Sequence, residues 1–419
     1  MHNNRKNIPK SRTSDKSDTS SQNQYLFGEP QLIAGESTFK DPNKDTKQFG
    51  NWEKLVQLVP EPIREPQMKL EDIIGKDQVQ KIESAGRIVF HSAGDTGARF
   101  TMASLGNEED VIDKMEEDFN ELDPRNIPSF FYHLGDVVYN FGENEYYYDQ
   151  FYEPFRNYPA PIFAIPGNHD GMVYRDDPEQ SLSALMSHFC DSEPRHSPEA
   201  GGLTRTTITQ PGVYFTLTAP LVTIIGLYSN ALEDPGVISS EGGTYPIDDK
   251  QKDFLKSELQ RLKNENYAGA VILAVHHPPY TSGEIHGGSV GMRKDIDDAI
   301  QFAGFAPHVI LSGHSHNYQR YTRQMDDGHQ IPYIIAGSGG HNATPIRQHG
   351  GRNPIRTPVT IEDVTFDRYF ADYGYLRIVV TLKLLRIEFH DVSSGLDSKS
   401  AMDACTVDLQ SRTLTTDTP

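Results

Sequence analysis

The chain has 419 residues and a formal net charge of −20 at pH 7, from 39 Lys and Arg against 59 Asp and Glu. This acidic excess argues against a protein that coats nucleic acid or binds anionic membranes, since both partners require a basic face. The sequence contains no apolar run of about 18 residues, so no membrane-spanning helix is predicted. Its two cysteines, Cys190 and Cys405, allow one disulfide at most, which excludes a disulfide-stabilised scaffold.

Both ends of the chain are poor in apolar residues. Residues 1–24 contain only Met1 and Ile8 as large apolar residues, too few to offset the entropy of ordering, so this segment is predicted to be disordered. Residues 393–419, rich in Ser, Asp and Thr, are interpreted in the same way as a polar C-terminal tail. The N-terminus has no apolar stretch of a signal peptide, so a cytoplasmic protein is expected, with secretion left open for a processed form.

The segment between these ends divides into a lead-in over residues 25–84 and one predicted domain over residues 85–392. Short apolar runs predict buried strands at 87–90, 130–134, 162–165, 271–275 and 309–311. Apolar residues at helical spacing predict helices after residue 97 (Val111, Met115, Phe119 and Leu122), over 248–265 and over 293–304. An antiparallel pair is predicted at 213–218 and 221–228, and late strands at 331–336, 374–381 and 384–391. Strands that alternate with helices and then follow one another indicate an α/β fold with two sheets or a mixed sheet.

Polar side chains follow five of these strands, at the point where each strand ends. They are Asp95, Asp136, Asn168, His276, and His314 with His316. The carboxyl ends of strands converge on one crevice in open α/β sheets, so these side chains are expected to meet. Carboxylate, amide and imidazole ligands without thiolates suit zinc, iron or manganese.

Each of these motifs has an ordinary explanation when taken alone. A Gly-Asp pair after a strand is usually a turn or a helix cap, and Gly167-Asn168-His169-Asp170 by itself is a turn. A single buried histidine such as His276 is often a core residue. Five such motifs in one domain-sized stretch, however, are not explained by independent coincidence.

The order GD…GDxxY…GNHD…HxP…GHxH resembles the calcineurin-like metallophosphoesterases, and within them the purple acid phosphatase branch. Many relatives have Asp-x-His as the first motif, but the position two after Asp95 is Gly97, which cannot ligate a metal. The resemblance implies that Tyr139, three after Asp136, takes the place of that histidine. It also implies a four-layer αββα sandwich of two mixed β-sheets flanked by helices.

The resemblance further implies a centre of two metal ions. Asp136 would bridge them; the other ligands would be Asp95, Tyr139 and His316 in the first site, and Asn168, His276 and His314 in the second. A phenolate favours iron in the first site, and iron, zinc or manganese is expected in the second. Between the neighbours His276 and His277, the family's His-x-Pro pattern favours His276 as the ligand.

The same resemblance implies a reaction in which metal-bound hydroxide attacks phosphorus. His169, held by Asp170, is the family's candidate for the group that protonates the leaving alkoxide, and His286 is a second candidate. His341 is a further residue that could line the pocket.

The predicted function is therefore an acid phosphatase-like phosphomonoesterase acting on a small phosphorylated substrate. One alternative is a phosphodiesterase acting on nucleotide or lipid head-group diesters, for which Arg293, Arg320 and Arg347 are candidate contacts with the second ester group. The alternative of another class is an inactive metallophosphoesterase-fold binding scaffold. The motifs do not decide between monoester and diester, and the oligomeric state is left open.

Overall fold

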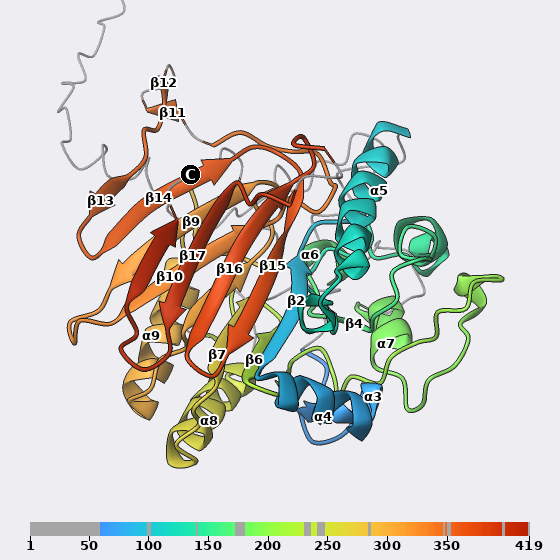
Figure 1. Cartoon of the computed structure of the whole chain (residues 1–419), viewed down its shortest axis with the longest axis horizontal. Coiled ribbons are helices and arrows are strands. Elements are labelled where there is room, and N and C mark those ends of the chain that lie inside the picture. The colour runs from blue at the N-terminus through green and yellow to red at the C-terminus, as the bar shows by residue number, and fades with distance from the viewer. Residues whose placement is uncertain are drawn as a thin grey trace, which may run out of the picture.

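Two β-sheets packed face to face form the centre of the molecule, with helices on their outer faces (Figure 1). The computed structural model describes residues 59–98, 102–139, 141–171, 181–229, 236–240, 248–283, 286–346, 348–349, 353–395 and 399–417. The predicted four-layer α/β sandwich is confirmed. The segment predicted to be disordered, residues 1–24, lies outside the described residues.

The larger sheet has nine strands in the order β1-β5-β6-β7-β8-β10-β9-β14-β13. Their bounds are β1 Gln67–Lys69, β5 Phe215–Ala219, β6 Val222–Leu227, β7 Ala270–Val275, β8 Val309–Ser312, β10 Gln330–Ala336, β9 Tyr318–Gln324, β14 Val364–Phe370 and β13 Val359–Ile361. Strands β6, β7, β8 and β10 run parallel, whereas β5 pairs antiparallel with β6, as predicted.

The smaller sheet has seven strands in the order β18-β17-β16-β15-β2-β3-β4. Their bounds are β18 Leu414–Asp417, β17 Asp403–Asp408, β16 Leu384–Asp391, β15 Gly374–Thr381, β2 Arg87–Ala93, β3 Phe131–His133 and β4 Ile162–Ala164. Strands β2, β3 and β4 are parallel and the others antiparallel. A separate pair is formed by β11 (Gln348–His349) and β12 (Asn353–Pro354).

Helices cover the outer face of each sheet. Helix α5 (Met102–Glu117) packs against β15 of the smaller sheet, and α8 (Lys250–Asn264) packs against β6 of the larger sheet and beside α9 (Val290–Ala303). The other α-helices are α3 Glu71–Ile74, α4 Lys76–Ala85, α6 Asn168–Gly171 and α7 Ser183–Phe189. Short 3₁₀ turns are η2 Asp118–Asn120, η3 Pro124–Asn126, η4 Asn144–Tyr146 and η6 Pro198–Ala200, and η5 (Tyr148–Tyr152) is a π turn. No helix among the described residues is long and apolar enough to cross a membrane.

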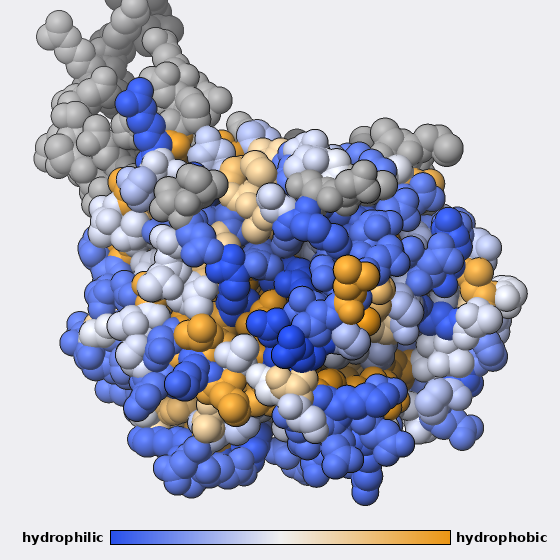
Figure 2. Space-filling view, viewed as in Figure 1, coloured by the Kyte–Doolittle hydropathy of each residue, from blue (hydrophilic) through white to orange (hydrophobic). Residues whose placement is uncertain are grey.

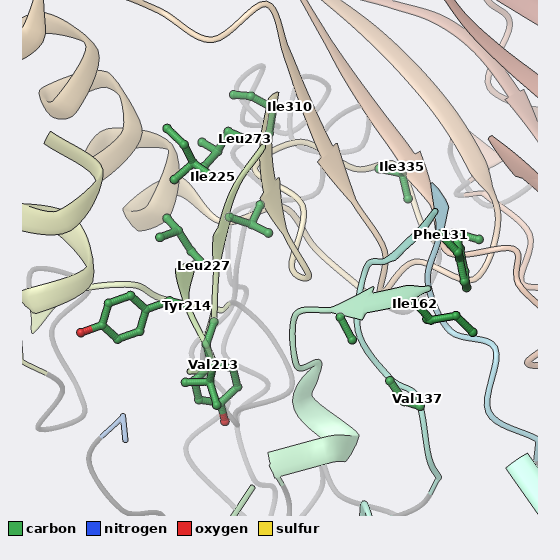
Figure 3. Close-up of a cluster of buried hydrophobic side chains, with 14 of the residues drawn as sticks. Phe131, Val137, Ile162, Val213, Tyr214, Ile225, Leu227, Leu273, Ile310 and Ile335 are labelled. Carbon is green, nitrogen blue, oxygen red and sulfur yellow. The ribbon is translucent and has the colours of Figure 1, made fainter. Parts of the chain in front are cut away.

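The alternation of side chains along the strands explains the two hydrophobic cores. In β7, Ile272 and Ala274 belong to the core between the sheets, whereas Val271, Leu273 and Val275 belong to the cluster that includes the helices. Both faces of such a strand are buried, so its sequence is continuously apolar. Figure 3 shows part of the cluster that includes the helices. Figure 2 shows that the outer surface in this view is mostly hydrophilic.

The prediction of a polar C-terminal tail is wrong over residues 403–417. Strand β17 pairs with β16, and β18 pairs with β17. Cys405 and Val407 alternate with polar residues and lie in the core between the sheets. Two large apolar residues among Ser, Thr and Asp are too few to show in the composition, and this segment becomes a strand only through its pairing partners.

The structure adds detail to the lead-in segment and corrects the prediction for the helix after residue 97. The lead-in segment contributes β1 to the edge of the larger sheet, where it pairs with β5. The predicted helix after residue 97 ends at Glu117 and passes into η2, so Leu122 is fully exposed rather than on a buried face. Cys190 and Cys405 are both buried as free thiols, so they do not pair.

We expect the buried His308 to make stability depend on pH. Its Nδ1 accepts a hydrogen bond from Val271 N–H at 2.9 Å, and burial lowers its pKa to about 3. The unfolded chain takes up a proton near pH 6.5 and the folded chain does not, so stability falls as the pH drops below 6.5. His308→Asn, whose Oδ1 can replace Nδ1, should remove about 2 kcal/mol of the loss between pH 7 and pH 5.

Urea unfolding at both pH values checks this expectation. His329→Asn is the control for the loss of a histidine at the surface, because His329 is partly exposed beside Asp327. An equal loss of stability in the parent and in His308→Asn would show that His308 is not the responsible group.

Candidate metal centre

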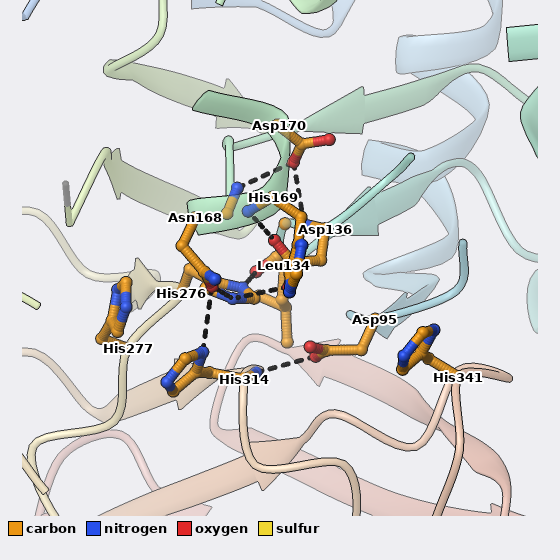
Figure 4. Close-up of polar contacts among 12 residues, drawn as sticks. Asp95, Leu134, Asp136, Asn168, His169, Asp170, His276, His277, His314 and His341 are labelled. Atoms are coloured by element: carbon orange, nitrogen blue, oxygen red, sulfur yellow. Dashed lines mark hydrogen bonds and ion pairs between the residues drawn. The ribbon is translucent and has the colours of Figure 1, made fainter. Parts of the chain in front are cut away.

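The polar residues at the five strand ends meet where the two sheets lie against each other. Asp95, Asp136 and Asn168 follow β2, β3 and β4 of the smaller sheet. His276 follows β7 of the larger sheet, and His314 with His316 follows β8. All six are buried, and the close-up in Figure 4 shows five of them converging. The structure thus brings together the predicted ligands from both sheets.

The first group of donors consists of Asp95, Asp136 and His316, with one ligand atom of each within 4.8 Å of the others. The Tyr139 hydroxyl lies 2.9 Å from Asp136 Oδ2, 3.2 Å from Asp95 Oδ1 and 3.2 Å from His316 Nε2. Four donor atoms therefore surround one point.

The second group consists of Asp136, His276 and His314. Asn168 Oδ1 lies 3.1 Å from His276 Nε2 and 3.0 Å from His314 Nδ1. His276 Nε2 also lies 3.3 Å from Asp136 Oδ2, the oxygen that faces Tyr139. One oxygen atom is thus shared by the two groups.

The atoms that face away from the two groups are held by the backbone. Asp95 Oδ2 accepts a hydrogen bond from His314 N–H at 2.8 Å, and Asp136 Oδ1 accepts one from His169 N–H at 2.9 Å. His276 Nδ1 donates to the Leu134 carbonyl at 2.8 Å, which leaves Nε2 facing the shared oxygen. Such outer partners fix the ring orientation and the tautomer of a metal ligand.

Three of these residues have a strained backbone. Asp95, Asp136 and His314 adopt positive φ angles of 58°, 57° and 67°. A non-glycine residue in this region costs about 1–3 kcal/mol and persists where its surroundings require it. Here the strain turns each side chain from the end of its strand into the shared crevice.

This donor set fits two metal ions. Burial of two carboxylates is costly unless positive charge compensates it. Burial lowers the pKa of His276, but Asp136 and Asp95 outweigh that effect and raise it to about 9. Oxygen and imidazole donors that converge on two points, with one oxygen in common, suit a pair of cations.

The sequence model of the calcineurin-like phosphoesterases matches residues 90–318, which include every residue of both groups. The chain belongs to this family. Two solved structures resemble this chain in fold, at 15% sequence identity and over 77% of its length: a purple acid phosphatase, PPD1, from yellow lupin (TM-score 0.51, 54% of that chain covered), and GAP50 of Plasmodium (TM-score 0.50, 89% covered). The chain thus spans about half the length of the lupin enzyme. No curated protein matches the chain.

The presence of Tyr139 in place of a histidine at position 97 has a steric reason. A Cβ atom on Gly97 would lie 2.6 Å from the Val137 carbonyl oxygen and 2.9 Å from Cδ2 of Tyr139. The Tyr139 ring therefore occupies the space that a side chain at position 97 would need. In this chain, therefore, the first group can be completed from position 139 and not from position 97.

The two candidate general acids lie beside the donor groups. The His169 ring centroid is 4.2 Å from that of Tyr139. The His286 ring centroid is 4.1 Å from that of His314 and 5.6 Å from that of His316. The ring centroid of His277 is 4.2 Å from that of His314, and its Nδ1 lies 2.8 Å from Ser229 Oγ. Of the neighbours His276 and His277, it is therefore His276 that faces the shared oxygen.

Asp170, predicted to hold the general acid His169, holds the backbone of the Asp136 loop. Its Oδ2 accepts hydrogen bonds from the backbone N–H groups of Asp136 and Gly167, both at 2.8 Å. Its Oδ1 accepts from Val137 at 3.0 Å and Val138 at 3.2 Å. Both oxygens are therefore committed to shaping the Asp136 loop, which makes Asp170 a positioning residue. A sequence motif shows which side chains are present, but it does not show which backbone N–H groups will donate hydrogen bonds to them.

The site predicted from the sequence also lacked Gln150, which makes two hydrogen bonds with the backbone of Tyr139. Gln150 Oε1 accepts from Tyr139 N–H at 2.9 Å, and its Nε2 donates to the Tyr139 carbonyl at 2.8 Å. Gln150 lies in the π turn η5, a rare conformation that is frequent at functional sites. No sequence signal distinguishes it from other glutamines.

Of the basic residues considered for a second ester group, Arg320 is excluded by its surroundings. Its side chain is buried, and its Nε donates to Asp403 Oδ2 at 2.7 Å. Arg293 lies over the Tyr280 ring, 5.3 Å from the centroid. Arg347 lies outside the described residues.

Proposed function

We propose that this chain is a phosphoric ester hydrolase with a dinuclear metal centre, an acid phosphatase-like phosphomonoesterase. The observation that carries the proposal is the position of Asp136 Oδ2, which faces donors of both groups. A carboxylate oxygen in that position suits a bridge between two cations, the arrangement of two-metal phosphoryl transfer. Tyr139 favours iron in the first group, and the second suits iron, zinc or manganese.

The ions, when bound, supply positive charge that offsets charge on the phosphoryl oxygens and lowers the pKa of water. The chain's own residues position these ions and serve the leaving group. Asp170 and the backbone N–H of His169 keep the Asp136 carboxylate in place. The side chains of His169 and His286 lie next to the two donor groups, where a leaving alkoxide can take a proton from either. The net charge does not oppose an anionic substrate, because bound cations dominate the local field.

The substrate class is tested by comparing two model esters. The full chain, reconstituted with iron plus zinc or manganese, is assayed on p-nitrophenyl phosphate and on bis(p-nitrophenyl) phosphate. We expect kcat/KM to favour the monoester by about tenfold or more. Asn168→Ala should lower both activities, which assigns them to this site. A ratio that favours the diester would keep the metal centre and make the protein a phosphodiesterase.

The alternative of another class is a binding scaffold. GAP50, which is described as an anchor in the inner membrane complex of Plasmodium, has a similar fold. Against this alternative, Asp95, Asp136, Asn168 and three histidines are buried around two points, an arrangement that is costly without ions. A parent protein that retains two metal ions per chain but hydrolyses neither ester would favour the scaffold.

A further inference from the structure

A segment outside the five motifs contacts every member of the first donor group except the shared Asp136. This segment, residues 337–344, follows β10 and is called the clasp below. At its start, Gly94 N–H donates to the Ala336 carbonyl at 2.8 Å, Gly339 N–H to the Gly94 carbonyl at 3.0 Å and His341 N–H to the Asp95 carbonyl at 2.9 Å. These consecutive hydrogen bonds join the clasp to the loop that presents Asp95.

The other end of the clasp holds the loop that presents His316. Thr344 N–H donates to the His316 carbonyl at 2.9 Å, and Asn317 Nδ2 donates to the Thr344 carbonyl at 3.1 Å. The clasp therefore spans from the Asp95 loop to the His316 loop, and His341 lies between the two attachments.

The His341 side chain covers the remaining member, Tyr139. The two rings stack with centroids 3.6 Å apart and an interplanar angle of 8°. His341 Nδ1 donates to the Gly97 carbonyl at 2.8 Å, and its ring meets His316 edge-on at 4.8 Å. The side chain of His341 is buried, so the stack is shielded from solvent.

Close packing and a further hydrogen bond fix the position of the clasp backbone. A Cβ atom on Gly340, whose φ is +147°, would lie 2.6 Å from the Cα of Glu108 in α5. Ser338 anchors the clasp to the start of β15, because its carbonyl accepts from Gly374 N–H at 2.9 Å. Since the backbone on either side is fixed, the His341 ring is held against Tyr139.

We infer that His341 is a positioning residue for the first metal group, which holds the Tyr139 phenol at the point that Asp95, Asp136 and His316 face. This inference rests on the proposed function, because that point is proposed to receive iron. The geometry gives a reason for the placement: Gly97 leaves one side of the Tyr139 ring without a side chain, and the imidazole fastened to the Gly97 carbonyl supports the ring there.

The test compares His341→Ala, His341→Phe and the parent, each reconstituted with ferric iron and zinc. Iron per chain and the visible absorption of the iron–phenolate contact report the first group, and zinc per chain reports the second. We expect His341→Ala to bind iron at least tenfold more weakly, with a shifted absorption band and unchanged zinc, since outer partners tune ligands by about this amount. His341→Phe, which retains the stack but not the hydrogen bond, should keep the band near its parent position.

A matched control is available on the outer face of the smaller sheet. His390 is also buried, and its ring stacks on Tyr375 with centroids 5.5 Å apart and an interplanar angle of 18°. His390→Ala removes a looser histidine–tyrosine stack that includes no member of the first donor group, so it should leave both the iron affinity and the band unchanged. Equal iron affinity and an unshifted band in His341→Ala would overturn the inference.

A measurement without metal separates this inference from the proposed function. In the NMR spectrum of histidine-labelled, metal-free protein, the Tyr139 ring should shift the His341 ring protons upfield, and Tyr139→Leu should remove that shift. If the parent takes up no iron, the proposed first site fails, and the NMR shift still decides whether His341 supports Tyr139. An unshifted His341 signal in the parent would overturn the inference by itself.

Discussion

Asp136→Asn should abolish the binding of both metal ions together and lower kcat/KM on p-nitrophenyl phosphate by about a thousandfold. The substitution keeps the shape of the side chain and an oxygen that can accept from His169 N–H, but it removes the charge of the oxygen shared by the two groups. Two cations then lose the negative charge between them and repel each other. Substitution of any other ligand should have a smaller effect on metal content. Each of those ligands belongs to one group, so the ion in the other group should be retained.

Metal content per chain and kcat/KM are measured on the same preparations. Asp363→Asn is the matched control, because Asp363 pairs with Arg323 at the surface of the larger sheet and takes no part in the site. The assignment of Asp136 as the bridging residue is wrong if Asp136→Asn retains both ions and an activity within tenfold of the parent.

Asp403→Ala should lower the free energy of unfolding by about 3–5 kcal/mol while the folded protein keeps its metal content. Asp403 in β17 accepts from Arg320 Nε in β9 at 2.7 Å and from the Tyr318 hydroxyl at 2.8 Å. This contact joins the smaller sheet to the larger one, and the side chains of Asp403 and Arg320 are 1% and 4% exposed. Removal of the carboxylate leaves a buried guanidinium whose remaining acidic partner among the described residues is Asp367, at 3.3 Å.

Urea unfolding of single and double variants checks this expectation. In the double variant with Arg320→Met and Asp403→Leu, the buried charge is removed with its partner, so most of the lost stability should return. If the double variant is as unstable as the sum of the single variants, the cost arises from packing and not from an unpaired charge.

The strands, the helices and the ligand types could be predicted because their signals are local. Strands 374–381 and 384–391 appear in the structure with the predicted bounds, since their apolar patterns lie within a few residues. The same holds for the glycines and polar residues at the strand ends, where a turn and a ligand occupy neighbouring positions. The exchange of a histidine for Tyr139 is also visible in the motifs, although its steric cause at Gly97 is not.

The missed elements depend on partners far away in the chain. Strand β17 is a strand because β16 and β18 pair with it, and its buried Asp403 meets Arg320 from the other sheet. Asp170 becomes a positioning residue through backbone groups more than 30 positions earlier. No pattern within a short window contains such information.

The sequence by itself determined the fold class, the order of the motifs and the chemical types of the ligands, because each depends on residues close together in the chain. Only the tertiary structure decided that one Asp136 oxygen faces both donor groups, and that the clasp joins the Asp95 and His316 loops around Tyr139. These relations arise where two sheets pack, so side chains more than 100 positions apart set each other's place.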